Sequence, residues 1–278
     1  MPVIALTSSR GSPGVTTTAL GLTLVWPRPL VLMEADVAGS SSIGAGYLRG
    51  SLDPRRGLIN LAVEHRAGTL SPDSVREQAI PLTDDESRLL VPGLATADQV
   101  GSMTPELWGR LGGVLLALDR AGTDVVVDAG RLGATGGPEP VLRQAHVVLL
   151  VMRTSLDAVV SARARAGWLR ELLADSAAGH EGLGVLLVGE GRPYRAAEVA
   201  KAVGLPVVAV LSHDEPNAQV LSHGAPRGRR FDTSPLVRSA RSAADEIQRG
   251  ATERATHLAP PVTASEEVSE FANDQPTP

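Results

Sequence analysis

The sequence is dominated by short apolar runs that alternate with segments of helical spacing, and this alternation restricts the possible folds more than any other feature. The apolar runs, each bounded by turn residues, lie at 2–6, 29–34, 88–93, 124–130, 146–151, 183–189 and 206–211. They are too short for helices and rich in Val and Leu, which is typical of strands buried on both faces. Segments with helical spacing lie between them, notably at 105–120, 155–175 and 194–203. Alternation of strand and helix predicts right-handed crossovers and a single α/β domain, with a doubly wound, mostly parallel sheet flanked by helices.

The composition supports such a core and excludes several kinds of site. Of the 278 residues, 43% are hydrophobic but only 3% are aromatic, so Val, Leu, Ile and Ala must build the core. The absence of cysteine excludes disulfides, thiolate metal sites and a cysteine nucleophile. The formal net charge of −5 argues against bulk attraction to a polyanion. The N-terminus does not resemble a secretory signal and no apolar run is long enough to span a bilayer, so we expect a cytoplasmic protein.

The last part of the chain changes character after one more helical segment. Residues 235–249 begin with Pro and place their apolar side chains near one face, which predicts a final docked helix. After Gly250 the sequence is acidic, contains several prolines and shows no sustained periodicity. We therefore expect a folded domain over 1–249 and a disordered tail over 250–278.

Residues 7–18, TSSRGSPGVTTT, form a Gly/Ser/Pro turn between the first apolar run and an apolar helical segment. At the carboxyl end of a parallel sheet, such a turn directs backbone N–H groups at an anion, and the helix that follows adds its positive end. Gly11 and Gly14 permit the turn, and Thr16 or Thr17 offers a hydroxyl to Mg²⁺. Taken alone, a turn of this composition is more often only a turn, so its interpretation depends on residues elsewhere.

Carboxylates follow two further strands of the expected sheet. Glu34 and Asp36 stand at the end of the second apolar run, and Asp128 stands at the end of the fourth. Since the carboxyl ends of strands in a doubly wound sheet line one crevice, these three side chains are expected to converge on the glycine-containing turn. An acid at a strand end also serves to cap the next helix. We favour a functional role for Asp128 and keep both interpretations open for Glu34.

The ordered series of motifs resembles the MinD/ParA family of deviant Walker A P-loop ATPases, over about residues 1–248. The stretches that carry the resemblance are SRGSPGVTTTALGLT, VLMEADVAGSSS, DVVVDAG, AHVVLLVMRTSLDAVVSARA and GLPVVAVLSHDEPNAQVLSHG. From RGLINLAVEHRAG to LLVPGLATADQVG the chain is most similar to the CpaE/TadZ-like branch, which serves pilus and secretion machinery. The resemblance implies a P-loop NTPase-like fold, ATP and Mg²⁺ as ligands, and a homodimer.

The family's Walker A loop has departures here. Its pattern, K-G-G-x-G-K-[ST]-[ST], falls on Arg10, Gly11, Ser12, Pro13, Gly14, Val15, Thr16 and Thr17. Arg10 takes the place of the signature lysine that reaches the partner's phosphates across a nucleotide-sandwich dimer, and it keeps the charge. Val15 takes the place of the lysine that contacts the β- and γ-phosphates, and it has neither donor nor charge. The single lysine of the chain, Lys201, lies far downstream, so a shifted alignment does not supply the missing group. This degenerate loop predicts weak or absent ATP hydrolysis.

The resemblance also assigns roles to the polar residues. By analogy Thr16, Asp36 and Asp128 are the Mg²⁺ ligands, and Asp36 orients the attacking water with Arg10 as the second catalytic group. The segment SHDEPN, residues 212–217, borders the base in relatives, which implies nucleotide contacts for Asp214 and Pro216.

One base-binding feature of the relatives is missing. Many of them place an adenine-recognising Asn after the strand that corresponds to 183–188, whereas this chain has Gly189 and Glu190 there. That loop is either a modified base pocket or a surface turn, and the turn is slightly preferred.

Partners follow from the resemblance and from charge. A nucleotide-dependent switch of this family implies a protein partner in a pilus, secretion or partition apparatus. The basic cluster PRGRR at 226–230 permits DNA contacts but is more typical of a solvated surface. The acidic, Pro-interrupted tail gives no support to an amphipathic membrane anchor.

Three functions remain in view. The first is a switch that positions cellular machinery, and the second is a pseudo-ATPase scaffold that no longer binds nucleotide. The third, a metabolic P-loop enzyme, ranks last because no additional catalytic constellation is found.

Overall fold

The computed structural model describes residues 2–11, 14–38, 41–53, 55–176, 179 and 181–258. Its central feature is a single eight-stranded sheet, with strand order β3-β4-β2-β5-β1-β6-β7-β8. The strands are β1 (Val3–Ser8), β2 (Leu30–Glu34), β3 (Ile80–Pro81), β4 (Arg88–Val91), β5 (Asp124–Arg131), β6 (Val147–Arg153), β7 (Leu183–Val188) and β8 (Val207–Leu211). All neighbouring pairs are parallel except β3 with β4. Each apolar run identified in the sequence forms a strand, so the predicted doubly wound sheet is confirmed.

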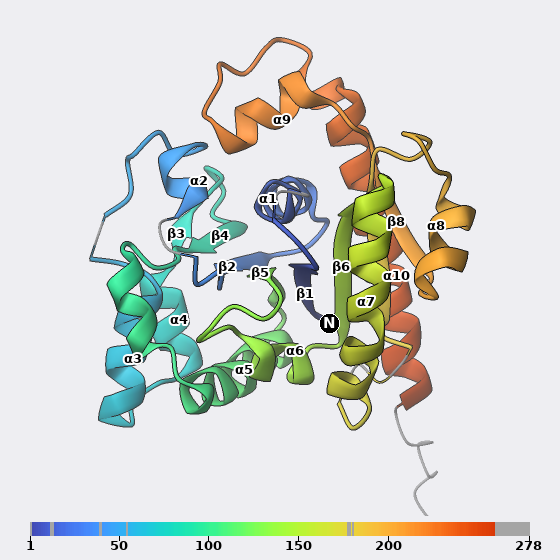
Figure 1. Cartoon of the computed structure of the whole chain (residues 1–278). Helices are drawn as coiled ribbons and strands as arrows, with labels where there is room; N and C mark the ends of the chain where they lie inside the picture. The colour runs from blue at the N-terminus through green and yellow to red at the C-terminus, as the bar shows by residue number, and fades with distance from the viewer. Residues whose placement is uncertain are drawn as a thin grey trace, which may run out of the picture.

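Helices cover both faces of this sheet (Figure 1). They are α1 (Val15–Val25), α2 (Ser42–Ala45), α3 (Leu58–Ala67), α4 (Pro72–Gln78), α5 (Pro105–Arg120), α6 (Glu139–Gln144), α7 (Leu156–Leu173), α8 (Ala196–Val203), α9 (Glu215–Ser222) and α10 (Pro235–Leu258), with short 3₁₀ turns at Ala97–Ser102 and Phe231–Thr233. One core lies between the sheet and α1, α9 and α10, and a larger one lies between the sheet and the helices α3 to α8. No helix of the described part of the chain is long and apolar enough to cross a membrane.

The strand order places the turn after β1 at the centre of the carboxyl edge of the sheet. Strand β1 pairs with β5 on one side and with β6 on the other. On the far side of β5 lies β2, and its last residue, Glu34, pairs in register with Asp128. In open parallel sheets, ligands bind outside the carboxyl ends of the strands, at the point where the strand order reverses. The loops after β1, β2 and β5 therefore meet at the place where such a site is expected.

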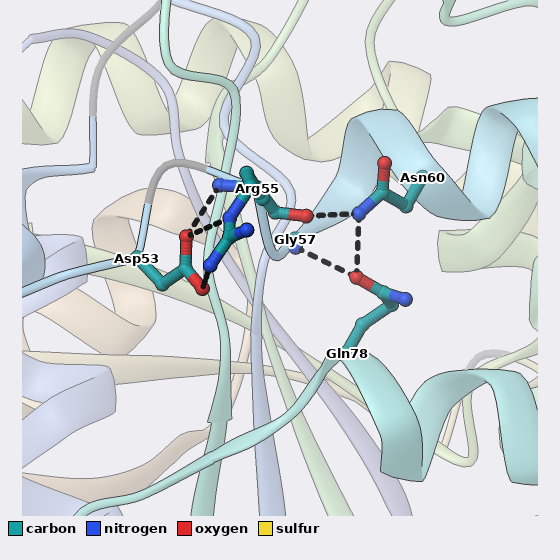
Figure 2. A network of polar contacts seen from close by, with 5 residues as sticks. All are labelled: Asp53, Arg55, Gly57, Asn60 and Gln78. Carbon is teal, nitrogen blue, oxygen red and sulfur yellow. Dashed lines mark hydrogen bonds and ion pairs between the residues drawn. The ribbon is translucent and has the colours of Figure 1, made fainter.

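Side-chain hydrogen bonds order the connection from α2 to α3 (Figure 2). The Asn60 amide nitrogen donates to the Gln78 amide oxygen at 2.8 Å and to the backbone oxygen of Arg55. The same Gln78 oxygen accepts from the backbone N–H of Gly57 at 3.3 Å. Asp53 accepts from both the backbone and the side chain of Arg55. These contacts attach the connection to the C-terminal end of α4.

The structure corrects the expected end of the folded domain. Helix α10 does not stop at residue 249 but continues to Leu258. Ala251 is buried in the core beneath α10, and the Arg254 guanidinium donates to the backbone oxygen of Glu181 at 3.2 Å. Packing against the domain thus extends a helix beyond the point where periodicity in the sequence fades, so the disorder expected from residue 250 is wrong as far as residue 258. Residues 259–278 lie outside the described part of the chain.

Candidate functional site

The turn after β1 leaves the first turn of α1 free of side-chain caps. Gly14 is the N-cap residue, with φ 94° and ψ 38°, a left-handed conformation that favours glycine. No side chain caps the helix there, and its first turn carries no acidic residue. The N–H groups and the positive end of α1 therefore remain available to an anion. Of the remaining predicted loop residues, Gly11 is exposed, whereas Ser12 and Pro13 lie outside the described residues.

A cavity of about 410 Å³ opens in front of this turn, and we refer to it as the loop cavity. Its lining includes Gly14, Val15, Thr16, Asp36, Gly130 and Arg131, together with the end of α9. The volume lies within the range of small-molecule sites. Gly11 and Thr17 also line it, so the predicted loop residues that the structure describes, apart from Arg10, surround one space.

Asp128 is buried at the base of this site. Its side chain is 1% exposed, and it accepts hydrogen bonds from the Thr16 hydroxyl and from the backbone N–H of Gly130, the latter at 3.0 Å. Burial raises the pKa of Asp128 to about 7, although both hydrogen bonds act in the opposite direction. The structure therefore brings Thr16 and Asp128 into direct contact.

Asp36 approaches the end of β5 unusually closely. A Cβ atom added to Gly130 would lie 2.2 Å from the Asp36 carboxyl carbon, and Gly130 has a φ of +61°. A side chain at position 130 would be strained at this φ and would force the Asp36 carboxyl group to move. One Asp36 oxygen accepts from the backbone N–H of Ala38 at 2.9 Å. Asp36 and Thr16 both line the loop cavity.

The Glu34 carboxylate is held by hydrogen bonds to the segments that follow β2 and β4. Its carboxylate accepts from the Ser41 hydroxyl, from the backbone N–H of Ile43 at 3.3 Å and from that of Gly93 at 3.2 Å. Burial raises the pKa of Glu34, and these hydrogen bonds lower it. Glu34 does not line the loop cavity, so of the two interpretations left open by the sequence the structure favours the structural one.

Arg10 lies apart from the residues with which the family pattern associates it. Its guanidinium forms an ion pair with Asp157 in the first turn of α7, and the two side chains are 47% and 61% exposed. Arg10 does not line the loop cavity. An ion pair this exposed contributes about 0–1 kcal/mol, so it restrains Arg10 only weakly.

Val15 belongs to the core as well as to the site. Its side chain is 7% exposed and packs in the apolar cluster beneath α1, while the residue also lines the loop cavity. The position that carries a phosphate-binding lysine in the family pattern is thus occupied by an aliphatic group that stabilises α1 against the sheet.

A second cavity of about 480 Å³ adjoins the first and shares Gly14 and Thr17 with it. Asp214 lines this second cavity, but its carboxylate accepts from the Asn217 amide at 2.9 Å and from the backbone N–H of Leu236 at 3.3 Å. Asp214 therefore links α9 to the start of α10. Pro216 is exposed and lines neither of the two cavities.

The loop after β7 contains the buried Gly189 and the exposed Glu190. Glu190 accepts from the backbone N–H of Ala196 at 3.0 Å, at the start of α8. Neither Gly189 nor Glu190 lines the second cavity.

Two arginines at this edge were missed by the sequence analysis. Arg131, the last residue of β5, lines the loop cavity, and Arg153, the last residue of β6, lines the second cavity. Arg131 directly follows the predicted strand 124–130, and Arg153 lies two residues beyond the predicted strand 146–151. Their place after these strands was the available signal, but only the acids at strand ends were considered.

The oxygen atoms at and beneath the loop cavity fit Mg²⁺. The Thr16 hydroxyl and the Asp36 carboxylate line the cavity, and the buried Asp128 carboxylate contacts Thr16; these are the hard donors that this ion prefers. Within the described residues no group of three or more His, Cys, Asp or Glu could hold a metal. Mg²⁺ in nucleotide sites takes one or two carboxylates, and substrate phosphates and water complete its shell.

Comparison with known proteins identifies the fold. No family model and no curated protein matches the sequence. Among solved structures, the MinD protein of Pyrococcus horikoshii OT3 complexed with Mg-ADP is 16% identical, with 91% of this chain and 98% of that chain covered and a TM-score of 0.67. A ParA family ATPase from Chlorobium tepidum TLS is 16% identical, with 87% and 98% covered and a TM-score of 0.66. The McdA(D38A)–ATP complex of Cyanothece is 17% identical, with 90% and 96% covered and a TM-score of 0.65. The chain therefore has the fold of the MinD and ParA ATPases.

Proposed function

We propose that this chain is a MinD/ParA-type switch that binds Mg·ATP in the loop cavity and positions cellular machinery. The observation that carries the proposal is the uncapped start of α1 at Gly14, which faces a cavity containing Thr16 and Asp36. Solved structures with this fold include complexes with Mg-ADP and with ATP. The proposal extends to the CpaE/TadZ-like branch, with pilus, secretion or partition machinery as the cargo, a homodimer as the working form and the cytoplasm as the location.

Different groups of the site bind the phosphates, the metal and water. The N–H groups at the start of α1 hold phosphate oxygens, since Gly14 leaves them uncapped. Thr16, Asp36 and Asp128 hold Mg²⁺, which neutralises phosphate charge when it is bound. The Asp36 carboxylate, fixed against Gly130, orients water at the cavity. Because Val15 offers no cation to the phosphates, hydrolysis is slow or absent.

A pseudo-ATPase scaffold is the second candidate, and two observations favour it. Val15 is buried in the core, and Arg10 is paired with Asp157 rather than placed in the loop cavity. A scaffold of this kind keeps the fold and its partners but does not bind nucleotide.

Calorimetric titration of the full chain with Mg·ATP, together with phosphate release, distinguishes the two. The switch predicts saturable binding, slow or absent release, and a Thr16→Val variant that loses the Mg²⁺ dependence of binding because it lacks the hydroxyl. A Thr69→Val variant, at an exposed threonine outside both cavities, serves as the matched control for handling and folding. Absence of wild-type binding at millimolar Mg·ATP would contradict the switch and leave the scaffold.

A further inference from the structure

The loop cavity contains a cation that the Walker A pattern does not include. Among the described residues that line it, Arg131 is the only arginine, and none is a lysine. Arg131 ends β5 and pairs in register with Ser8, the last residue of β1. It thus lies beside the start of the loop whose own cationic position is occupied by Val15.

The local backbone sets the direction of Arg131. Along a strand, successive side chains point to opposite faces. Ala129 and Leu132 are both buried in the core under α5 to α7, and the left-handed Gly130 between them shifts the alternation by one residue. Arg131 precedes Leu132 and is exposed, so it belongs to the α1 side of the sheet, where the cavity lies.

Arg131 is also available for a ligand. Within the described part of the chain it makes no hydrogen bond and no ion pair with another side chain, whereas Arg10 is paired with Asp157. Arg153 lines the second cavity and not this one. His223, the remaining basic side chain at the loop cavity, is in hydrogen-bond contact with the Ser222 hydroxyl at 2.7 Å.

We infer that Arg131 is the phosphate-binding cation of this site and replaces from β5 the charge that position 15 lacks. This inference rests on the proposed binding of Mg·ATP. A guanidinium presents a planar fork of donors that matches two phosphate oxygens, so one arginine can contact two oxygens of a polyphosphate at once. Asp36 and Thr16, which line the same cavity, hold the metal, so the phosphates receive positive charge from the metal as well as from Arg131.

The test compares Mg·ATP affinity of the full-length wild type, Arg131→Ala and Arg131→Lys by calorimetric titration. Because Arg131→Ala removes hydrogen bonds to charged phosphate oxygens, it should weaken Mg·ATP binding about ten- to hundred-fold. Arg131→Lys keeps the charge and should weaken it less. Arg110→Ala, an exposed arginine on α5 across the sheet, is the matched control and should bind as wild type does. Thermal unfolding of each variant checks that its fold is intact.

A second variant distinguishes loss of the Arg131 charge from disruption of the fold. Val15→Lys restores the family's cation. Combined with Arg131→Ala, it should therefore bring the Mg·ATP affinity back towards that of the wild type. Introduced alone, it should raise the Mg·ATP affinity by a smaller factor. If the wild type binds but Arg131→Ala binds equally well, this inference is wrong and the proposed function stands. If the wild type does not bind, both are overturned. Failure of Val15→Lys to recover the affinity of a folded double variant would also contradict the inference.

Discussion

At the scale of single residues, Gly130 connects the two carboxylates that we propose as Mg²⁺ ligands. Its backbone N–H donates to Asp128, and its missing side chain makes room for the Asp36 carboxyl group. One glycine thereby fixes the relative position of a buried carboxylate and a cavity-lining one. The residue belongs to neither the Walker A pattern nor the acidic set, yet the placement of both acids depends on it.

Gly130→Ala should lower the free energy of unfolding by about 1–3 kcal/mol, because the new methyl group meets Asp36 at a strained backbone position. It should also weaken Mg²⁺-dependent nucleotide binding, since Asp36 must move. Gly109→Ala in α5 is the matched control: a Cβ there meets nothing within 4 Å, and helix propensity predicts a gain of about 0.5–1 kcal/mol. Urea unfolding measures both, and a Gly130→Ala variant as stable as the wild type would refute the close contact.

At the scale of elements, the sequence predicted the strands well because each is a short apolar run buried on both faces. The acids at the loop cavity were predictable for the same reason, since strand ends meet at one edge. Strand β3 has only two residues and α2 only four, too few to produce a period. The pairing of Arg10 with Asp157 joins positions 147 apart, and no local pattern encodes it. Arg131 was missed because the sequence shows only an arginine after a strand and does not show that this arginine lines a cavity.

The length of α10 gives a prediction for this element. A chain ended at residue 249 should unfold about 3–8 °C below a chain ended at residue 258, because it lacks the buried Ala251 and the contact from Arg254 to Glu181. The buried methyl group and the hydrogen bond together contribute roughly 1–2 kcal/mol to the free energy of unfolding. Differential scanning calorimetry of the two chains makes the comparison. Equal midpoints would show that the last turns of α10 add nothing to the domain.

At the scale of the whole molecule, the two cores join through the central strands, and His146 lies where β6 begins beside β1. Its Nδ1 accepts from the backbone N–H of Val3 at 2.9 Å, so the imidazole is neutral in this contact. Burial lowers the pKa of His146 from its ordinary value of 6.5, and the nearby Asp119 acts in the opposite direction. Protonation would therefore remove the hydrogen bond at the start of the central strand.

Global stability should respond to pH through this histidine. The unfolded chain takes up the proton near pH 6.5 and the folded chain only at lower pH, so the unfolded state binds more protons in between. The contribution is fully present above about pH 6.5 and declines as the pH falls below it. His146→Asn keeps an acceptor for Val3 and does not titrate, so its stability should fall less between about pH 7.5 and about pH 5.5. Urea unfolding measures the free energy of unfolding of the wild type and of His146→Asn at both pH values. If it declines equally in the two proteins, His146 is not a source of the pH dependence.

Val15 has a consequence for any redesign of this site. Its side chain belongs to the core, and burying a valine is worth about 1.5–3 kcal/mol. A lysine introduced at this position would give up that packing before any ligand arrives. A cation added at the exposed end of a neighbouring strand would leave the core beneath α1 intact.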